Sequence, residues 1–159
     1  MQGWRVAKAK RINDLTGAGA AIAGGRWNDV DVPAVYLGLS PGICSLETFV
    51  HTTSRIQPPL KIALIELPDD PGLYWEPGLE DLPKGWNAVP ADRPSMDFGT
   101  RWLRSTSHLG LIVPSVVMPL ERNLVLNPAH PAMGMVRIKE VYNFAYDERM
   151  FKDFPKTLQ

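Results

Sequence analysis

The sequence predicts an α+β domain in which short helices pack against a bent, largely antiparallel β-sheet. Short apolar and β-branched runs outnumber the segments that begin like helices, and 15 prolines with 13 glycines imply many turns and short elements. The last apolar run alternates as a half-buried antiparallel strand does. Because 159 residues is a usual length for one domain, we expect residues 1–159 to form a single domain.

The strands are predicted from apolar runs that end at turn residues, and they cover residues 4–8, 34–39, 60–68, 109–117, 123–127 and 135–147. Pro114 interrupts the fourth run and removes a backbone donor, so we expect a bulge or a sheet edge there. The sixth run predicts a strand with one apolar face, made of Val136, Ile138, Tyr142, Phe144 and Tyr146.

Two helices are predicted from their start signals. Ser40 can cap a helix whose first turn holds Pro41. Ser95 is expected to cap a second helix over residues 95–107. Residues 15–28 are expected to form a loop with one helical turn. Residues 67–94 are rich in turn residues and predict an extended loop, of a length that is often functional.

The composition argues against several classes of protein. Seventeen basic and seventeen acidic side chains cancel, whereas direct nucleic-acid binding usually needs a basic face. We find no apolar run of the length that a membrane-spanning helix requires, and the first ten residues do not resemble a signal peptide. The single cysteine, Cys44, cannot form an internal disulfide. We therefore expect a cytoplasmic protein that binds neither membrane nor nucleic acid directly.

Glu47 is the first candidate for a functional residue. At 3.6 residues per turn it shares one face of the predicted helix with Ile43, Leu46 and Val50. A carboxylate in an apolar stripe needs a partner or a cleft, because its desolvation is otherwise costly. The alternative is a glutamate at the helix edge that reaches solvent past its neighbours.

Arg26 and Tyr36 precede Glu47 at intervals of about ten residues. Arg26 follows two glycines, which let a ligand approach the backbone, and its planar guanidinium suits bidentate contact with phosphate. Tyr36 lies within a predicted strand, where its ring either packs in the core or stacks on a planar ligand. Taken alone, Arg26 is equally consistent with an ordinary surface arginine.

Other motifs give weaker evidence for a functional site. The glycine-rich stretch from Gly17 places Ile22 where a dinucleotide-binding fingerprint needs glycine or alanine. Cys44 and His51 lie about 10 Å apart along a helix, too far for a nucleophile and its base. The three histidines lack metal-ligand spacing, so we expect no metal site. Ser115 lacks the elbow motif of serine hydrolases, and Asn123 has the character of an ordinary turn residue.

The order of several motifs resembles a known family. These are "WRV" near the start, "GGRWN", "PAVYLGLSPGICSLE", a strand ending in "LP", and "PSVVMPLERNLVLNPAHP". Together they resemble the RES-domain toxins, the toxic halves of toxin–antitoxin pairs whose antitoxin is an Xre-like helix-turn-helix protein. The resemblance covers nearly the whole chain. It implies a fold similar to ADP-ribosyltransferase toxins and the degradation of NAD as a substrate, with no permanently bound cofactor.

The resemblance also implies roles for individual residues. Glu47 would be the acidic catalytic residue, and Ser115 would be the family's serine, although Ser40 and Ser45 lie near the same motifs. Residues that would contact the dinucleotide are Arg5, Arg26, Tyr36 and Ser40. The implied partners are an Xre-type antitoxin that covers the active cleft and a second copy of the toxin in a homodimer.

Two functions of different classes remain open from the sequence. Cleavage of the nicotinamide–ribose bond develops positive charge on the ribose, which a carboxylate can stabilise, and the acceptor would be water, phosphate or a protein side chain. The rival is a non-enzymatic domain that binds a partner through Trp75 and Trp86 of the predicted loop.

Overall fold

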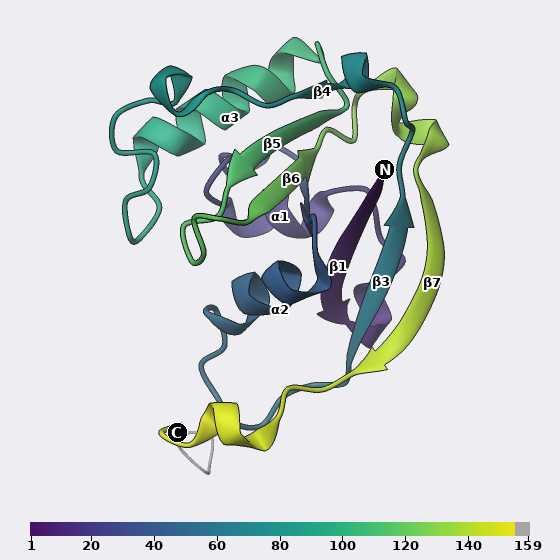
Figure 1. Cartoon of the computed structure of the whole chain (residues 1–159), viewed down its shortest axis with the longest axis vertical. Coiled ribbons are helices and arrows are strands. Elements are labelled where there is room, and N and C mark those ends of the chain that lie inside the picture. Colours follow the sequence, from purple (N-terminus) through teal and green to yellow (C-terminus); the bar gives the residue numbers. More distant parts are fainter. Residues whose placement is uncertain (155–159) are drawn as a thin grey trace.

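The computed structural model describes residues 1–154, which form a mixed α+β fold around an open sheet (Figure 1). In these residues the sheet has seven strands in the order β4-β5-β6-β2-β1-β3-β7, and only the β4–β5 pair is parallel. The predicted fold class is therefore confirmed. The strands are β1 (Gln2–Lys8), β2 (Val35–Gly38), β3 (Leu60–Glu66), β4 (Tyr74–Trp75), β5 (Gly110–Pro114), β6 (Arg122–Leu126) and β7 (Arg137–Phe144).

The sheet bends where its two halves meet. Strand β1 pairs with β3 along its whole length but with β2 only at Trp4 and Gly38. This narrow junction separates β4, β5, β6 and β2 from β1, β3 and β7, and Figure 1 shows the two groups running in different directions. The predicted bend of the sheet is thus a consequence of one short strand pairing.

Helices cover the sheet at different places. They are α1 (Ala18–Ala23), α2 (Pro41–Phe49) and α3 (Arg93–Ser105). Helix α2 packs against β1, β2 and β6, and α3 carries Trp102 and Leu103 into a core with Leu111 and Val113 of β5. In residues 1–154 no helix is long and apolar enough to cross a membrane.

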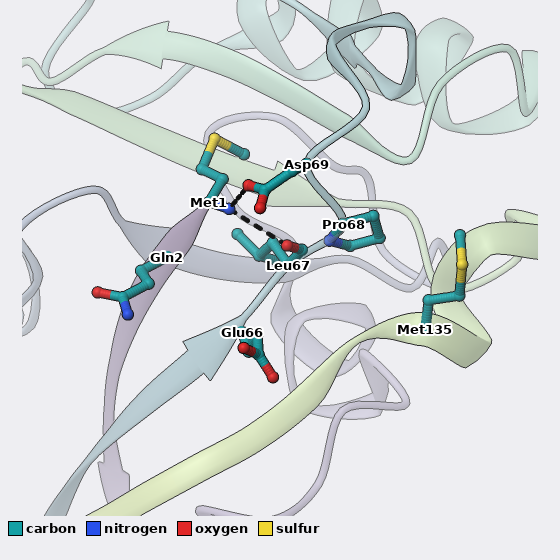
Figure 2. A pocket seen from close by; sticks show the side chains of 7 residues that line it. All are labelled: Met1, Gln2, Glu66, Leu67, Pro68, Asp69 and Met135. Carbon is teal, nitrogen blue, oxygen red and sulfur yellow. Dashed lines mark hydrogen bonds and ion pairs between the residues drawn. The ribbon is translucent and has the colours of Figure 1, made fainter.

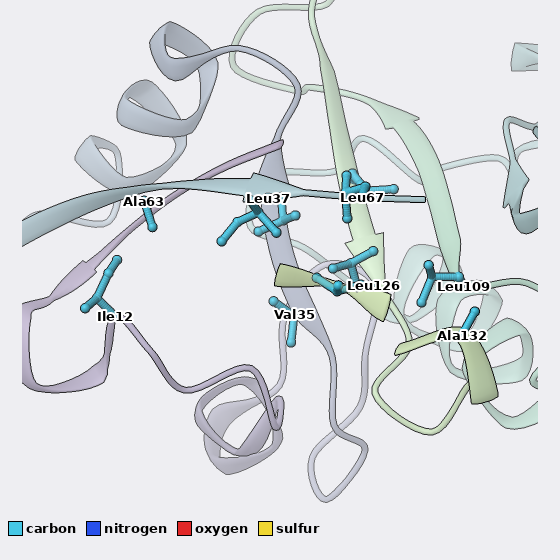
Figure 3. Close-up of a cluster of buried hydrophobic side chains, with 11 residues drawn as sticks. Ile12, Val35, Leu37, Ala63, Leu67, Leu109, Leu126 and Ala132 are labelled. Atoms are coloured by element: carbon cyan, nitrogen blue, oxygen red, sulfur yellow. The ribbon is translucent and has the colours of Figure 1, made fainter. Parts of the chain in front are cut away.

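A first apolar core lies on the sheet face opposite α2 (Figure 3). Alternation along the strands places Val35 and Leu37 of β2 there, beside Leu124 and Leu126 of β6. The intervening residues point to the other face, where Val125 joins the core under α3. The fully buried side chains of this first core include Ile65, Leu109, Leu124 and Leu126.

The start of α2 confirms its predicted cap, whereas the predicted cap of α3 is wrong. Ser40 Oγ accepts a hydrogen bond from the Ile43 backbone N–H at 3.2 Å. Helix α3 begins at Arg93, and Asp92 rather than Ser95 is its N-cap. Pro94 in the first turn allows the earlier start, because proline is tolerated where no helical N–H is needed.

One strand prediction is confirmed and another is corrected. Pro114 ends β5 beyond the two residues that β4 pairs, so it lies at an open sheet edge, one of the two expected outcomes, and not in a bulge. The irregularity lies instead between β3 and β7, where Ile65 faces Ile138 but Leu64 faces Glu140. The extra residue on β7 reverses the alternation, because one inserted residue exchanges the two faces of a strand. The predicted single apolar face of residues 136–146 is therefore wrong.

The loop over residues 67–94 contains only short elements, as predicted: β4 and the 3-10 turns η2 (Pro71–Leu73) and η3 (Leu79–Asp81). Its tryptophans pack inward. Trp86 stacks on Trp27 with ring centroids 6.1 Å apart, and Trp75 stacks on Phe98 at 5.5 Å. These rings are half-buried within the chain, which weakens the hypothesis of a tryptophan-based binding loop.

Residues 1–154 contain three further 3-10 turns: η1 (Ala9–Arg11), η4 (Pro131–Met135) and η5 (Glu148–Phe151). The turn η5 belongs to an aromatic cluster that packs against the C-terminal end of α2. Phe49 at the end of α2 contacts Tyr146 and Phe151, with ring centroids 5.1 and 5.5 Å apart. Tyr146 also donates a hydrogen bond to the Ser45 carbonyl at 2.7 Å. The C-terminal part of the described chain thereby fixes the helix that carries Glu47.

Candidate active site

Glu47 is held on the inner face of α2 by two side chains from the sheet. Its Oε1 atom accepts hydrogen bonds from Ser115 Oγ and from Asn123 Nδ2, both at 2.6 Å. Glu47 is half-buried and Ser115 is fully buried. Among residues 1–154 no group hydrogen-bonds to Oε2. The carboxylate is therefore fixed through one oxygen, and the other can receive a ligand.

Ser115 reaches Glu47 because β5 ends at the residue before it. Its backbone N–H donates to the Glu121 carbonyl at 3.0 Å. Its Oγ accepts from the backbone N–H groups of Val117 and Met118 at 3.1 and 3.0 Å. These two donors leave the hydroxyl proton for Glu47. Ser115 thus acts as a hydrogen-bond donor toward the carboxylate.

Gly38 and Asn123 face each other in the β2–β6 ladder, directly under α2. A Cβ atom on Gly38 would lie 2.6 Å from the Cys44 backbone nitrogen, so only glycine permits this approach of the helix. The close packing brings Glu47 within reach of the Asn123 amide.

Tyr36 organises the turn that presents Arg26. Its hydroxyl donates to Asn28 Oδ1 at 2.6 Å and accepts from the Trp27 backbone N–H at 3.0 Å. A Cβ on Gly25 would lie 2.8 Å from this hydroxyl oxygen, which explains a glycine before Arg26. Burial raises the pKa of Tyr36 above its ordinary value, so the phenol stays protonated and is no base at neutral pH.

Arg26 lies between Glu47 and the loop over residues 67–94. Its Nη1 atom donates to the carbonyls of Trp86 and Ala88 at 3.0 and 2.8 Å. Burial lowers the pKa of the Arg26 guanidinium, while the nearby Glu47 and Tyr36 act in the opposite direction. The structure therefore brings together Arg26, Tyr36, Glu47 and Ser115, which come from four separate segments.

Arg5 lies apart from this group. It faces Ala63 in the β1–β3 ladder, on the sheet face opposite α2. Its guanidinium donates to the carbonyls of Ile12 and Asp14, and burial lowers its pKa. In the structure Arg5 holds the turn after β1, and we leave it out of the candidate site.

The other two serines are used within α2. Ser40 caps the helix and donates from Oγ to Glu121 Oε2 at 3.2 Å. Ser45 donates to the Pro41 carbonyl at 2.7 Å. Of the three serines that the motifs left open, Ser115 is the one that contacts Glu47.

Asn123 is the residue of the candidate site that sequence reasoning missed, because at the start of the predicted strand 123–127 it was given only the character of a turn residue. It lies inside β6, two residues before the buried Val125 and on the same face of the strand. A polar residue on an otherwise buried strand face was the available signal. Its hydrogen bond to Glu47 could not be inferred from the sequence, because the two residues are 76 positions apart.

Cys44 is not a candidate nucleophile, and the described residues form no candidate metal site. Burial raises the pKa of the Cys44 thiol to about 11, so it stays protonated at neutral pH. Within residues 1–154, no group of three or more histidine, cysteine or acidic side chains could hold a metal ion. A cavity of about 400 Å³ at the ends of β1 and β3 (Figure 2) contains none of the site residues.

The chain is similar to known proteins over most of its length. The RES domain matches residues 2–147. A relative from Sphingobium sp. (strain YBL2), named Prs ADP-ribosylating toxin, is 43% identical over 156 residues, covering 94% of this chain and 96% of the relative. Toxin Res of Yersinia enterocolitica is 39% identical over 137 residues, covering 85% and 89%.

A solved structure has the same fold. A chain of the M. tuberculosis MbcT–MbcA toxin–antitoxin complex aligns with a TM-score of 0.71 and 19% identity, over 98% of this chain and 89% of that one. The fold is thus that of a known toxin–antitoxin component. The domain match and the two relatives go further: this chain belongs to the RES family.

Proposed function

We propose that this chain is a toxin that arrests growth by consuming NAD in the cytoplasm, breaking the bond between nicotinamide and ribose. The observation that carries the proposal is the half-buried Glu47 carboxylate, fixed at Oε1 by Ser115 and Asn123. Two donors to one oxygen orient the carboxylate before the substrate arrives, which is the arrangement that electrostatic catalysis needs. Membership of the RES family supports an enzyme that acts on NAD.

The chemistry follows from the charges. As the bond to nicotinamide lengthens, the ribose gains oxocarbenium character, and the free Oε2 of Glu47 stabilises this charge and accepts a hydrogen bond from a ribose hydroxyl. Nicotinamide leaves as a neutral molecule, so no strong acid is required. Arg26 uses only Nη1 toward the loop carbonyls, and its other N–H groups suit the pyrophosphate. NAD is the substrate and no cofactor is retained.

Water or inorganic phosphate is the first candidate acceptor, and either would deplete NAD. A protein side chain is the second, and a specific observation favours it: the relative with 43% identity is named for ADP-ribosylating Prs. Both reactions share the cleavage step at Glu47 and differ in what attacks the ribose.

An antitoxin is the proposed partner. The fold neighbour was solved as a toxin–antitoxin complex. A partner that covers the surface around Glu47 and Arg26 would prevent NAD from binding there. We further propose that the antitoxin is of the Xre type and that the toxin forms a homodimer in the complex. DNA contact would belong to the antitoxin.

The test is to incubate the purified chain with NAD carrying a label on the adenylate half, and to follow nicotinamide and the label. Release of nicotinamide with label in ADP-ribose or its phosphorylated product supports NAD depletion. Label on an added protein acceptor supports transfer. The absence of nicotinamide release with water, phosphate and protein acceptors all present would contradict the proposal and favour a partner-binding domain.

A further inference from the structure

A second carboxylate lies in the row of residues beside Ser115. The β5–β6 ladder pairs Val113 with Asn123 and Pro114 with Arg122, and the Ser115 N–H bond to the Glu121 carbonyl at 3.0 Å continues it. Residues two apart on a strand share a face, so Glu121 lies on the face of Asn123. Glu47, Ser115, Asn123 and Glu121 therefore belong to one side of the sheet.

The β2 side of the sheet fixes the Glu121 carboxylate. The Leu39 backbone N–H donates to the Arg122 carbonyl at 3.1 Å, which places Ser40 opposite Glu121. Ser40 Oγ then donates to Glu121 Oε2 at 3.2 Å. The carboxylate is therefore held beside Ser40, the N-cap of α2.

No cation neutralises this second carboxylate. Glu121 is half-buried and forms no ion pair with another group of residues 1–154. The neighbouring Arg122 side chain turns away and bonds to Glu76 at 3.1 Å and to the Pro119 carbonyl at 3.1 Å. Among residues 1–154 the one hydrogen bond to the Glu121 carboxylate comes from Ser40 and reaches Oε2, so Oε1 can accept from a further donor.

The pair fits a displacement reaction. Ser115 links the two acidic residues, because its Oγ donates to Glu47 Oε1 and its backbone N–H donates to the Glu121 carbonyl. Enzymes that displace a sugar substituent with inversion use two carboxylates with room between them for the attacking molecule. In the β2–β6 ladder Tyr36 faces Val125 and Gly38 faces Asn123, so Tyr36 and Glu121 lie at opposite ends of this row and Glu121 is left for the acceptor.

We propose that Glu121 is the general base of the reaction, taking the proton from the hydroxyl group that attacks the ribose. The acceptor oxygen forms a bond to C1′ as the C1′–nitrogen bond breaks. The electron pair of that bond goes to the nicotinamide ring, which leaves neutral, and the acceptor proton passes to the Glu121 carboxylate. This inference rests on the proposed function and assigns the acceptor half of the same site.

The test compares Glu121→Gln with the parent in nicotinamide release, with and without sodium azide. The amide oxygen of the introduced glutamine can still accept from Ser40, so the fold is kept while the base is lost. We expect the rate to fall by about 10²–10⁴-fold, the usual contribution of a general base. Azide attacks without losing a proton, so it should restore nicotinamide release and yield an ADP-ribosyl azide. Glu140→Gln, an exposed change on β7, is the matched control and should behave as the parent.

Two results would overturn the inference while leaving NAD cleavage intact. One is a Glu121→Gln rate equal to that of the parent. The other is a reduced rate that azide does not restore, which would make Glu121 a support for α2 only; a lower melting temperature would accompany it. A parent chain without any nicotinamide release contradicts the proposed function itself, so the two failures are distinct.

Discussion

Single residues determine how the Glu47 carboxylate is used. Both donors bind the same oxygen, so Ser115 and Asn123 set the rotamer of Glu47 and leave Oε2 without a hydrogen bond from residues 1–154. Arg26 and Glu47 could be singled out from the sequence because each breaks a local pattern: an arginine after two glycines, and a carboxylate in an apolar stripe. Asn123 gave a weaker signal, a polar residue on an otherwise buried strand face, and its position opposite Gly38 under α2 follows only from the strand pairing.

Replacing Asn123 tests this orientation. Asn123→Asp sets a like charge against Glu47, which disfavours the ionised form. We expect the Asn123→Asp variant to release nicotinamide more slowly than the parent at acidic pH, so that the acid limb of its pH–rate profile moves to higher pH. Asn123→Ser, which lacks the charge, should move the limb less. Superimposable profiles of the parent and Asn123→Asp would contradict the assigned contact.

Cys44 should be chemically silent in the folded protein. Burial raises its pKa to about 11, and its exposed fraction is 6%. Alkylation by iodoacetamide near neutral pH should be at least about tenfold slower in the native chain than in the urea-unfolded chain, because only the thiolate reacts. Equal rates, followed by mass spectrometry, would show that the thiol is accessible and reactive.

At the scale of elements, α2 carries Glu47, the proposed catalytic residue, and the position of the helix depends on the strands that it packs against. The Ser40–Pro41 start signal is purely local, so the sequence predicted it correctly. The α3 start and the β7 bulge were missed because they depend on contacts with distant segments. Ser95 is buried in the fold and donates to the Asp92 carbonyl at 3.2 Å, while β7 adjusts its register to β3.

Two glycine-to-alanine substitutions distinguish the close packing of α2 on the sheet from the intrinsic helix propensity of its residues. Gly38→Ala puts a Cβ 2.6 Å from the Cys44 nitrogen, which would force α2 away from Asn123. We expect a loss of stability of about 1–3 kcal/mol, as in overpacked cores, and a large loss of nicotinamide release.

Gly42→Ala is the control, since its Cβ meets no atom closer than 3.8 Å. Alanine in a helix is favoured over glycine by about 0.5–1 kcal/mol, so this variant should keep activity and melt at the same or a higher temperature. Chemical denaturation and the activity assay together check both variants. A Gly38→Ala protein with parental activity would contradict the close-packing argument.

For the whole molecule, the open sheet and its bend gather a site from segments that are far apart in sequence. Composition and alternating runs predicted the fold class, because they report on local burial. The single β1–β2 pair that bends the sheet, and the packing of Trp75 and Trp86 inside the chain, follow from tertiary contacts that one sequence does not reveal.

The pair Asp29–Arg93 joins the Arg26 segment to α3, and it makes global stability depend on pH. Arg93 donates to Asp29 Oδ2 at 2.9 Å, and this bond, with one from the Val30 N–H, lowers the pKa of Asp29 from 3.8. The contribution is present above pH 3.8 and is lost as the pH falls through the lower folded-state pKa. The melting temperature of the parent should exceed that of Asp29→Asn at neutral pH, and the difference should shrink on acidification. A difference that is constant with pH would contradict this.

The most direct test of the central claim is the rate of nicotinamide release from NAD by Glu47→Gln, measured beside the parent and Glu140→Gln. Glutamine keeps the size of the side chain, and its oxygen can still accept from Ser115 and Asn123. We predict that Glu47→Gln loses about 10²–10³-fold in rate, as expected for a central electrostatic group, while remaining folded. Glu140→Gln should match the parent. A folded Glu47→Gln protein that releases nicotinamide at the parental rate would contradict the account, and Glu47 would then be a structural residue of α2.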